Sequence, residues 1–213
     1  MTVRVDLNLS LDGIVMPANQ TPENPMGEDW GRLVAAYIAT RTMRARVLHE
    51  TTGEGTTGVD DRYAAAYFDG VGAEIMGAGM FGLHAFPDDP DWRGWWGDEP
   101  PFQAPVLVLT HRERPPIHIA NGTRFEFLAA SPRAALAQAR ELAGGADIRI
   151  GGGASVARDF LAAGLVDRLH VAIAPIVLGR GVRLWDDLRE LERDYAVTSE
   201  VAESGVIHDT FVR

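Results

Sequence analysis

Three consecutive glycines stand between an alternating apolar stretch and a helical pattern. Residues 148–150 form the stretch, Gly151, Gly152 and Gly153 follow, and apolar residues at helical spacing continue to about Leu161. Glycine lets a backbone approach a ligand closely, and the free N–H groups and dipole of a helix's first turn attract an anion. The pattern favours phosphate binding, and the expected ligand is the pyrophosphate of a nucleotide. Tight packing without a ligand produces the same pattern.

Two other predicted strands end in residues that could meet the same ligand. Residues 73–76 form a short apolar run ending at Gly77, and residues 106–109 form another ending at Thr110. Ligands of open α/β sheets gather outside the carboxyl ends of strands. The glycines lack the Rossmann pattern, and no strand-end acid lies about 20 residues further on to take a ribose. We therefore expect a different nucleotide-binding fold.

Strands and helices alternate through the middle of the chain. Further strands are expected at 3–9, 125–128 and 168–173, with a closing hairpin at 195–201 and 205–212. Helices are expected from Trp30 toward Val47, at 60–68, and from Pro132 to about Leu142, where Ser131 is the cap. This order predicts an α/β fold with a sheet of mixed direction.

Composition excludes several classes of chemistry. The chain has no cysteine and all 20 basic residues are arginine, which rules out thiolate metal sites, a cysteine nucleophile, a lysine Schiff base and a lysine-bearing P-loop. A net charge of −10 argues against a nucleic-acid partner. The six histidines show no metal-ligand spacing, so no metal is expected.

Length and hydropathy suit one domain over residues 1–213. Hydrophobic residues make up 46% of the 213 positions, enough for a full core, and an inserted helix with a glycine-rich loop is expected around 28–59. No apolar run approaches the roughly 20 residues of a membrane span, and the first residues alternate like a strand. We expect no membrane partner and a cytoplasmic location.

Five segments, taken in order, resemble the dihydrofolate reductase-like family, in a bacterial branch similar to the reductase domain of riboflavin biosynthesis. They are residues 10–13 (SLDG), 75–77 (IMG), 108–111 (VLTH), 150–155 (IGGGAS) and 174–181 (APIVLGRG), so the resemblance covers nearly the whole chain. It implies a mixed, mainly parallel eight-stranded sheet flanked by helices, with an antiparallel C-terminal hairpin. It also implies NADPH as hydride donor and a homodimer.

The resemblance assigns cofactor roles residue by residue. The expected cradle for the pyrophosphate and nicotinamide ribose is Gly152, Gly153, Ala154, Ser155 and Val156, next to Gly77 and Gly151. The expected adenosine side is Leu109, Thr110 and His111, and the expected nicotinamide pocket is Leu7, Asn8 and Val15. The alternative for Leu7 and Val15 is that they fill the core, because buried Leu and Val are the norm.

Ala78 departs from the family pattern. An arginine commonly follows the glycine of this junction, where it can clamp the phosphate that distinguishes NADPH from NADH. We hypothesise that Arg112, or less strongly Arg114, takes over from the adjacent strand end. A solvated charged turn is the alternative.

Asp61 is the candidate acid. Hydride transfer to a C=N bond needs a protonated or hydrogen-bonded nitrogen, and a carboxyl in a dry pocket is the usual device. Asp61 lies sixteen residues before Gly77, a place that matches the substrate-binding acid of a dihydrofolate reductase. The alternative is that Asp60 and Asp61 simply cap a helix.

Two further clusters each have a functional and a structural interpretation. Trp92, Trp95 and Trp96, within the irregular residues 87–101, could cover a planar substrate or bury a loop edge. Arg41, Arg44 and Arg46 could grip a phosphate or form a solvated face.

The sequence therefore predicts an NADPH-dependent reductase. It would transfer hydride to a C=N, C=C or C=O carbon of a small planar substrate, such as a pterin, a pyrimidine or a natural product. A nucleotide-binding module without turnover is the alternative, supported by Ala78, and a phosphosugar-binding protein is a third reading.

Overall fold

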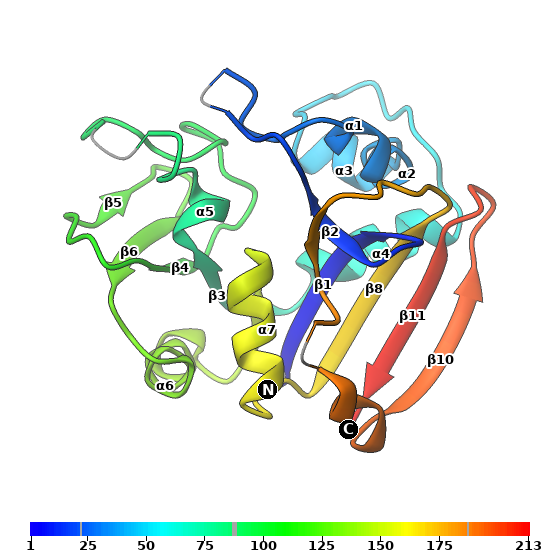
Figure 1. Ribbon diagram of the computed structural model, residues 1–213. Coiled ribbons are helices and arrows are strands. Elements are labelled where there is room, and N and C mark those ends of the chain that lie inside the picture. Colours follow the sequence, from blue (N-terminus) through cyan, green and yellow to red (C-terminus); the bar gives the residue numbers. More distant parts are fainter. Residues whose placement is uncertain (22, 87–88, 187) are drawn as a thin grey trace. The chain divides into compact units, whose positions relative to one another are not determined.

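The computed structural model describes every residue except 22, 87–88 and 187 (Figure 1). The chain folds as two compact units. Unit 1 holds Met1–Val5 and Gly70–Arg168, and unit 2 holds Asp6–Asp69 and Leu169–Arg213. Among the described residues, no helix combines the length and apolar character needed to cross a bilayer.

Unit 1 is an α/β unit with strand order β1-β7-β3-β4-β6-β5. All neighbours in this order are parallel except β5 and β6, which pair antiparallel. The strands are β1 (Val3–Ser10), β3 (Val71–Gly77), β4 (Pro105–Leu109), β5 (Ile117–His118), β6 (Arg124–Leu128) and β7 (Asp147–Ile150). The helices are α5 (Ala78–Phe81), α6 (Pro132–Ala143) and α7 (Ala154–Ala162).

The central strands of unit 1 are apolar on both faces. Ile75 and Met76 in β3, like Val106 and Leu107 in β4, are fully buried although neighbours in a strand point to opposite sides. Burial of both faces is typical of parallel strands covered by helices. Helices α6 and α7 both pack against β3 (Figure 1). The Ser131 hydroxyl starts α6 by accepting a hydrogen bond from the Ala134 N–H group.

The segment that contains Trp92, Trp95 and Trp96 packs against the core of unit 1. Trp92 donates its indole N–H to the carbonyl of Phe81 over 2.9 Å, and Trp96 packs on the same buried cluster as Trp92. Gly82 has φ +97°, and a Cβ there would come within 2.9 Å of Trp92 and Trp95. Residues 89–101 contain no helix or strand, and Pro87 and Asp88 lie outside the described residues. These contacts favour the interpretation in which the tryptophans bury a loop edge.

Unit 2 has strand order β10-β11-β8-β1, together with a small antiparallel pair. The strands not yet given are β8 (Arg168–Ala174), β10 (Ala196–Val201) and β11 (Ile207–Val212), with β2 (Ile14–Pro17) and β9 (Gly181–Arg183) in the pair. Its helices are α1 (Trp30–Leu33), α2 (Ala35–Ile38), α3 (Arg41–Arg46), α4 (Val59–Phe68) and the 3₁₀ helix η1 (Arg189–Arg193). Strands β10 and β11 form the predicted closing hairpin.

A continuous helix from Trp30 toward Val47 is not present, and that prediction was wrong. Three short helices replace it, and the clearest break is at Thr40, whose backbone is extended (φ −67°, ψ 148°). Its hydroxyl donates to the carbonyl of Tyr37 and accepts from the N–H of Met43, ending one helix and starting the next. In α3, Arg44 forms an ion pair with Glu50 at 2.6 Å.

The predicted fold class is confirmed. The sheet strands are mainly parallel, helices flank them, and the chain closes with an antiparallel hairpin. The two strand orders share β1. Together they contain nine strands among the described residues, where eight were expected. The expectation of one domain stays a prediction.

Candidate cofactor site

The loop between β7 and α7 has a backbone that only glycine adopts readily. Gly152 has φ +126° and Gly153 has φ +83°, both outside the range that L side chains favour. Gly153 caps α7, so the N–H groups of the helix's first turn begin directly after it. The Gly77 N–H donates to the Gly152 carbonyl over 3.2 Å, which joins this loop to the end of β3.

Two glycines of the site are needed for different reasons. A Cβ on Gly77 would lie 3.0 Å from Val156, so a side chain there would crowd the start of α7. A Cβ on Gly151 would lie 1.8 Å from the Glu74 carboxylate, which forms a buried ion pair with Arg149. Gly77 therefore keeps space beside the loop, whereas Gly151 accommodates the core.

A pocket of about 720 Å³ lies within unit 1 at this place. Its wall combines the carboxyl ends of β3, β4 and β6 with the first two turns of α7. The lining residues are Gly77, Ala78, Gly79, Leu83, His84, Leu109, Thr110, His111, Arg112, Ala129, Ala130, Pro132, Gly153, Ser155, Val156, Asp159 and Phe160. Strand ends and a helix N-terminus around one cavity suit a phosphate-bearing nucleotide.

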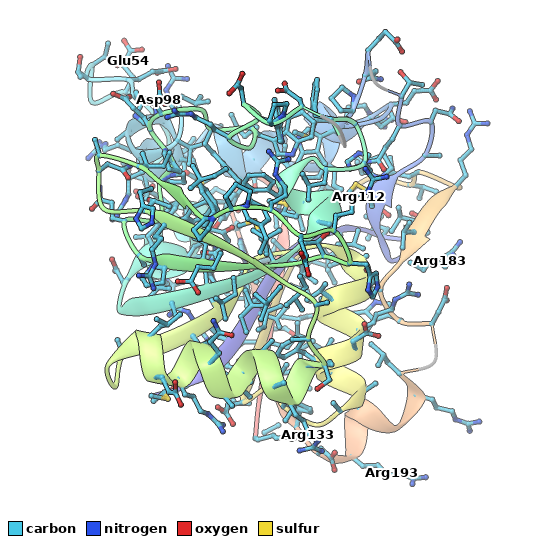
Figure 2. The ribbon with its side chains drawn as sticks, turned by 90° about the vertical axis from the view of Figure 1, so that its left-hand side faces the viewer. Glu54, Asp98, Arg112, Arg133, Arg183 and Arg193 are labelled. Atoms are coloured by element: carbon cyan, nitrogen blue, oxygen red, sulfur yellow. The ribbon has the colours of Figure 1, made fainter. Side chains whose placement is uncertain are left out.

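Potential cations line the pocket on the side of β4 and α5. Arg112 and His111 follow β4, and both are exposed. Arg112 is labelled in Figure 2. The Arg112 N–H donates to the Thr110 hydroxyl over 3.1 Å, which fixes the turn that carries them. His84 lines the same pocket, and its Nδ1 atom lies 3.8 Å from the position of a Cβ on Gly79. Charge on these groups would complement phosphate; Asp159 is the acid in the wall.

Most of the predicted cofactor residues meet in this pocket. Eight line it: Gly77, Leu109, Thr110, His111, Arg112, Gly153, Ser155 and Val156. Gly151, Gly152 and Ala154 belong to the same loop and helix start but are buried. Leu7, Asn8 and Val15 belong to unit 2, where Leu7 and Val15 are buried, and their nicotinamide role stays a prediction.

Sequence reasoning missed His84, Asp159 and the pair Ala129 and Ala130. The two alanines follow directly after β6, so the rule that ligands gather at strand ends could have found them. Asp159 lies four residues after Ser155, on the same face of α7. No comparable signal marks His84, which follows α5 in an irregular turn.

Asp61 belongs to unit 2, where it has a structural partner. Its Oδ1 atom accepts a hydrogen bond from the Thr42 N–H over 2.8 Å, in the first turn of α3. This contact satisfies a donor that the helix itself leaves free. The role of Asp61 as an acid stays a prediction. Within the part of the chain that the structure describes, no group of three His, Cys, Asp or Glu side chains could hold a metal ion.

The chain belongs to the RibD C-terminal domain family, which matches residues 1–207. The family expected from the sequence is thereby confirmed. A search of curated proteins found no match.

Solved structures show the same fold at low identity. A protein assigned to riboflavin biosynthesis from Shewanella sp. PV-4 is 21% identical, with a TM-score of 0.57 over 100% of this chain and 99% of that one. RibD from Acinetobacter baumannii is 17% identical with a TM-score of 0.53, over 99% of this chain and 57% of that one.

A diaminohydroxyphosphoribosylaminopyrimidine deaminase/5-amino-6-(5-phosphoribosylamino)uracil reductase from Thermotoga maritima is 14% identical, with a TM-score of 0.54. The match covers 100% of this chain and 56% of that one. The chain thus spans little more than half the length of these last two proteins.

Proposed function

We propose that the chain is a reductase that uses NADPH to reduce a C=N, C=C or C=O bond of a small planar substrate of pyrimidine or pterin type. The observation that carries the proposal is the unit 1 pocket, where three strand ends and the start of α7 surround about 720 Å³. Family membership supports it, because the Thermotoga maritima relative is described as a uracil-derivative reductase.

The residues present fit a dinucleotide. Gly152 and Gly153 hold a backbone that brings the start of α7 into the open pocket, and Gly77 leaves the adjacent strand end without a side chain. The N–H groups that follow Gly153 would bind the pyrophosphate, and Thr110 with His111 would hold the adenosine side. NADPH would supply the hydride, while the protein binds, orients and excludes water.

Binding and turnover separate this proposal from its alternatives. Quenching of tryptophan fluorescence by NADPH, followed by NADPH oxidation with a pyrimidine, pterin, imine or enone panel, is the expected result. Binding without oxidation across the panel would favour the nucleotide-binding module that Ala78 suggests. Absence of any NADPH binding would favour a phosphosugar ligand and would overturn the proposal.

Arg112 is proposed to select NADPH over NADH in place of the missing arginine at Ala78. Arg112→Ala should raise the KM for NADPH by about tenfold or more and leave the KM for NADH almost unchanged, because a charge-assisted contact to the extra phosphate contributes ~1.5–3 kcal/mol. Arg140→Ala, an exposed arginine on α6 outside the pocket, is the control for the change in net charge. An unchanged cofactor preference in Arg112→Ala would remove Arg112 from this role.

Asp61 is proposed as the acid that protonates the substrate. Asp61→Asn keeps an oxygen that can accept the Thr42 N–H bond, so the start of α3 should hold while the titratable group is lost. We expect kcat/KM to fall at least tenfold and its pH dependence to flatten, with the melting temperature nearly unchanged. A loss of stability with unaltered kcat/KM would assign Asp61 to capping alone.

We also expect a homodimer in the cytoplasm. The family resemblance is the basis for the dimer, and light scattering coupled to size-exclusion chromatography would measure it directly.

A further inference from the structure

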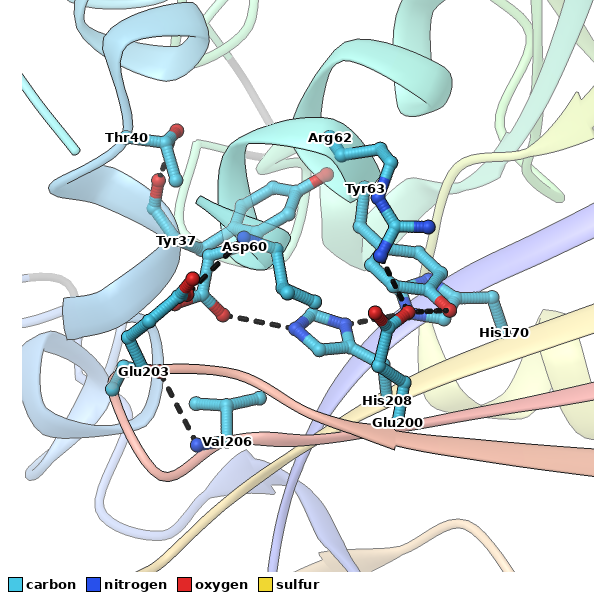
Figure 3. A network of polar contacts seen from close by, with 12 residues as sticks. Tyr37, Thr40, Asp60, Arg62, Tyr63, His170, Glu200, Glu203, Val206 and His208 are labelled. Carbon is cyan, nitrogen blue, oxygen red and sulfur yellow. Dashed lines mark hydrogen bonds and ion pairs between the residues drawn. The ribbon is translucent and has the colours of Figure 1, made fainter. Parts of the chain in front are cut away.

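Four side chains of unit 2 form a linear chain of polar contacts, and Figure 3 labels three of them, His170, His208 and Asp60. The Asp6 carboxylate on β1 lies 3.2 Å from Nδ1 of His170 on β8. The other ring nitrogen of His170, Nε2, lies 3.0 Å from Nδ1 of His208 on β11. Nε2 of His208 lies 2.9 Å from the carboxylate of Asp60, in the first turn of α4. One helix and three strands are thereby linked by three contacts.

This chain of contacts is shielded from water. The four side chains are between 0% and 10% exposed. The ring of Tyr63 stacks on both imidazoles, with centroids 4.4 Å from His170 and 4.1 Å from His208. Its position on α4, three residues after Asp60, places it over the imidazole pair.

The charged and titratable groups around the pair come from every element that packs there. They are Asp6 from β1, Asp60, Asp61, Arg62 and Tyr63 from α4, Glu200 from β10, Glu203 from the loop after β10, and Asp209 from β11. Arg62 and Glu200 neutralise each other at 2.5 Å, and the Tyr63 hydroxyl donates to Glu200. The largest effect on the charge of the imidazoles therefore comes from the two carboxylates in direct contact with them, Asp6 and Asp60.

Two neutral imidazoles and two ionised carboxylates carry too few protons to make all three contacts hydrogen bonds. Each contact joins two atoms that would both be acceptors without a proton between them, so three protons are needed. Two neutral imidazoles carry one N–H each and supply two. With both carboxylates ionised, one contact would bring two lone pairs together in a buried place, and a buried acceptor left without a donor is unfavourable.

We propose that Asp6, His170, His208 and Asp60 form a single proton-binding site, which in the folded protein at neutral pH holds one proton beyond those of two neutral imidazoles. The site then carries a net charge of −1 and every contact in it is a hydrogen bond. Its ligand is the proton itself, and the bound proton holds α4 on strands β8 and β11.

The electrostatics of His208 indicate where the extra proton resides. Burial lowers the pKa of His208; its hydrogen bond to Asp60 raises the pKa, and positive charge on His170 lowers it again. His208 is therefore the neutral member, donating through Nε2–H to Asp60 and accepting at Nδ1 from His170. The extra proton then lies in the contact between His170 and Asp6.

The proposal fixes the sign of a pH dependence. In the unfolded chain both histidines have pKa values of about 6.5, so they bind two protons well below this pH and none well above it. The folded site binds one throughout. Below about pH 6.5 the unfolded state binds more protons and stability rises with pH, whereas above it the folded state binds more and stability falls. The site's contribution therefore peaks near pH 6.5, and each arm changes the unfolding constant up to about tenfold per pH unit.

Nitrogen-15 NMR of the histidine side chains tests the proton count directly. At pH 7.5 the proposal expects His170 with both ring nitrogens protonated and His208 as a neutral Nε2–H tautomer. The exposed His84, His111 and His118 serve as internal references for the chemical shifts of imidazoles in contact with water. Neutral imidazoles at both buried positions at pH 6–7.5 would overturn the proposal.

Asp60→Asn distinguishes a proton site from a merely structural contact. The new amide can donate to Nε2 of His208, so both neutral histidines can then donate toward Asp6 and all three bonds form without an extra proton. We expect the doubly protonated signature to vanish at pH 7.5 and the alkaline arm of the stability profile to flatten. Asp209→Asn, next to His208 and bonded to Ser199, removes the same charge without touching the site and should retain both features. An unchanged profile in Asp60→Asn would also overturn the proposal.

Discussion

Glu74 and Arg149 form a buried ion pair in unit 1. Register places Glu74 on β3 opposite Arg149 on β7, and the guanidinium donates to both carboxylate oxygens at 2.6 and 3.2 Å. The two side chains are 2% and 1% exposed. Two charges removed from water to this extent depend on each other, because neither can recover its hydration.

Removing one member of this pair should cost far more than removing both. Arg149→Met leaves a buried carboxylate without its main partner and should lower the free energy of unfolding by about 3–5 kcal/mol. The double variant Glu74→Leu/Arg149→Met should recover much of that loss, since apolar side chains of similar volume tolerate the site. Urea unfolding of wild type, both single variants and the double variant measures the coupling. Additive losses would contradict this account.

Asp12 in unit 2 makes a contribution to folding stability that depends on pH, as the buried histidine site does. A hydrogen bond from the Ser10 hydroxyl, together with the backbone N–H groups of Leu178 and Gly179, lowers the pKa of Asp12 from 3.8 to about 2. A carboxyl whose folded pKa is depressed stabilises the fold above its unfolded pKa and loses that effect as pH falls through its folded pKa.

We therefore expect wild type to lose its stability advantage over Asp12→Asn as pH falls from about 4 to about 2, and to keep it constant above about pH 5. Asp98→Asn, at an exposed carboxylate, is the control for the loss of one charge. Chemical unfolding at several pH values measures the difference. A difference that stays constant down to pH 2 would show that Asp12 acts only through its shape.

At the scale of elements, periodicity predicted the long helices and the central strands. Helix α4 begins at Val59 with Gly58 as its cap rather than the expected Asp60, and α6 begins at the predicted proline after its serine cap. Strands β2, β9 and β5 were not predicted, because two to four residues carry too little periodic signal. In addition, β2 pairs with β9 from the far end of the chain, and local sequence does not encode such a partner.

The two candidate sites also differ in whether local sequence could predict them. The unit 1 pocket could be predicted because glycines that directly follow strands are a signal in the local sequence. The buried histidine site could not, since its members come from positions 6, 60, 170 and 208 and only the tertiary fold brings them together. His170 within the apolar run of β8, and His208 within β11, are signals that a sequence reader could have noted.

Thr40 explains why the expected long helix divides. Its buried hydroxyl makes two hydrogen bonds, to the Tyr37 carbonyl and from the Met43 N–H, so α2 ends and α3 begins around one side chain. Thr40→Val keeps the shape but loses both bonds and should destabilise the protein by about 1–2 kcal/mol. Thr40→Ser should restore most of the loss. Thr52→Val, at an exposed position, is the control in thermal unfolding; equal effects of the Thr40 and Thr52 variants would contradict the assignment.

At the scale of the whole molecule, the two units are not two consecutive pieces of chain. The chain passes from one unit to the other three times, after Val5, after Asp69 and after Arg168. Two of these passages fall inside strands, β1 and β8. A unit that unfolded alone would have to separate the first three residues of β1 from the rest of that strand, which should couple the unfolding of the two units.

Calorimetry with NADPH tests this coupling together with the cofactor site. The pocket is lined by unit 1 alone, yet we expect a single unfolding transition that NADPH shifts as a whole. At 100 times its dissociation constant a ligand adds about 2.7 kcal/mol to the free energy of unfolding, which for a chain of this length raises the melting temperature by about 5–10 °C. Gly152→Ala, whose φ of +126° does not suit a Cβ, should lose the shift. Two transitions of which NADPH moves only one would show that the units unfold independently, even though β1 and β8 run through both.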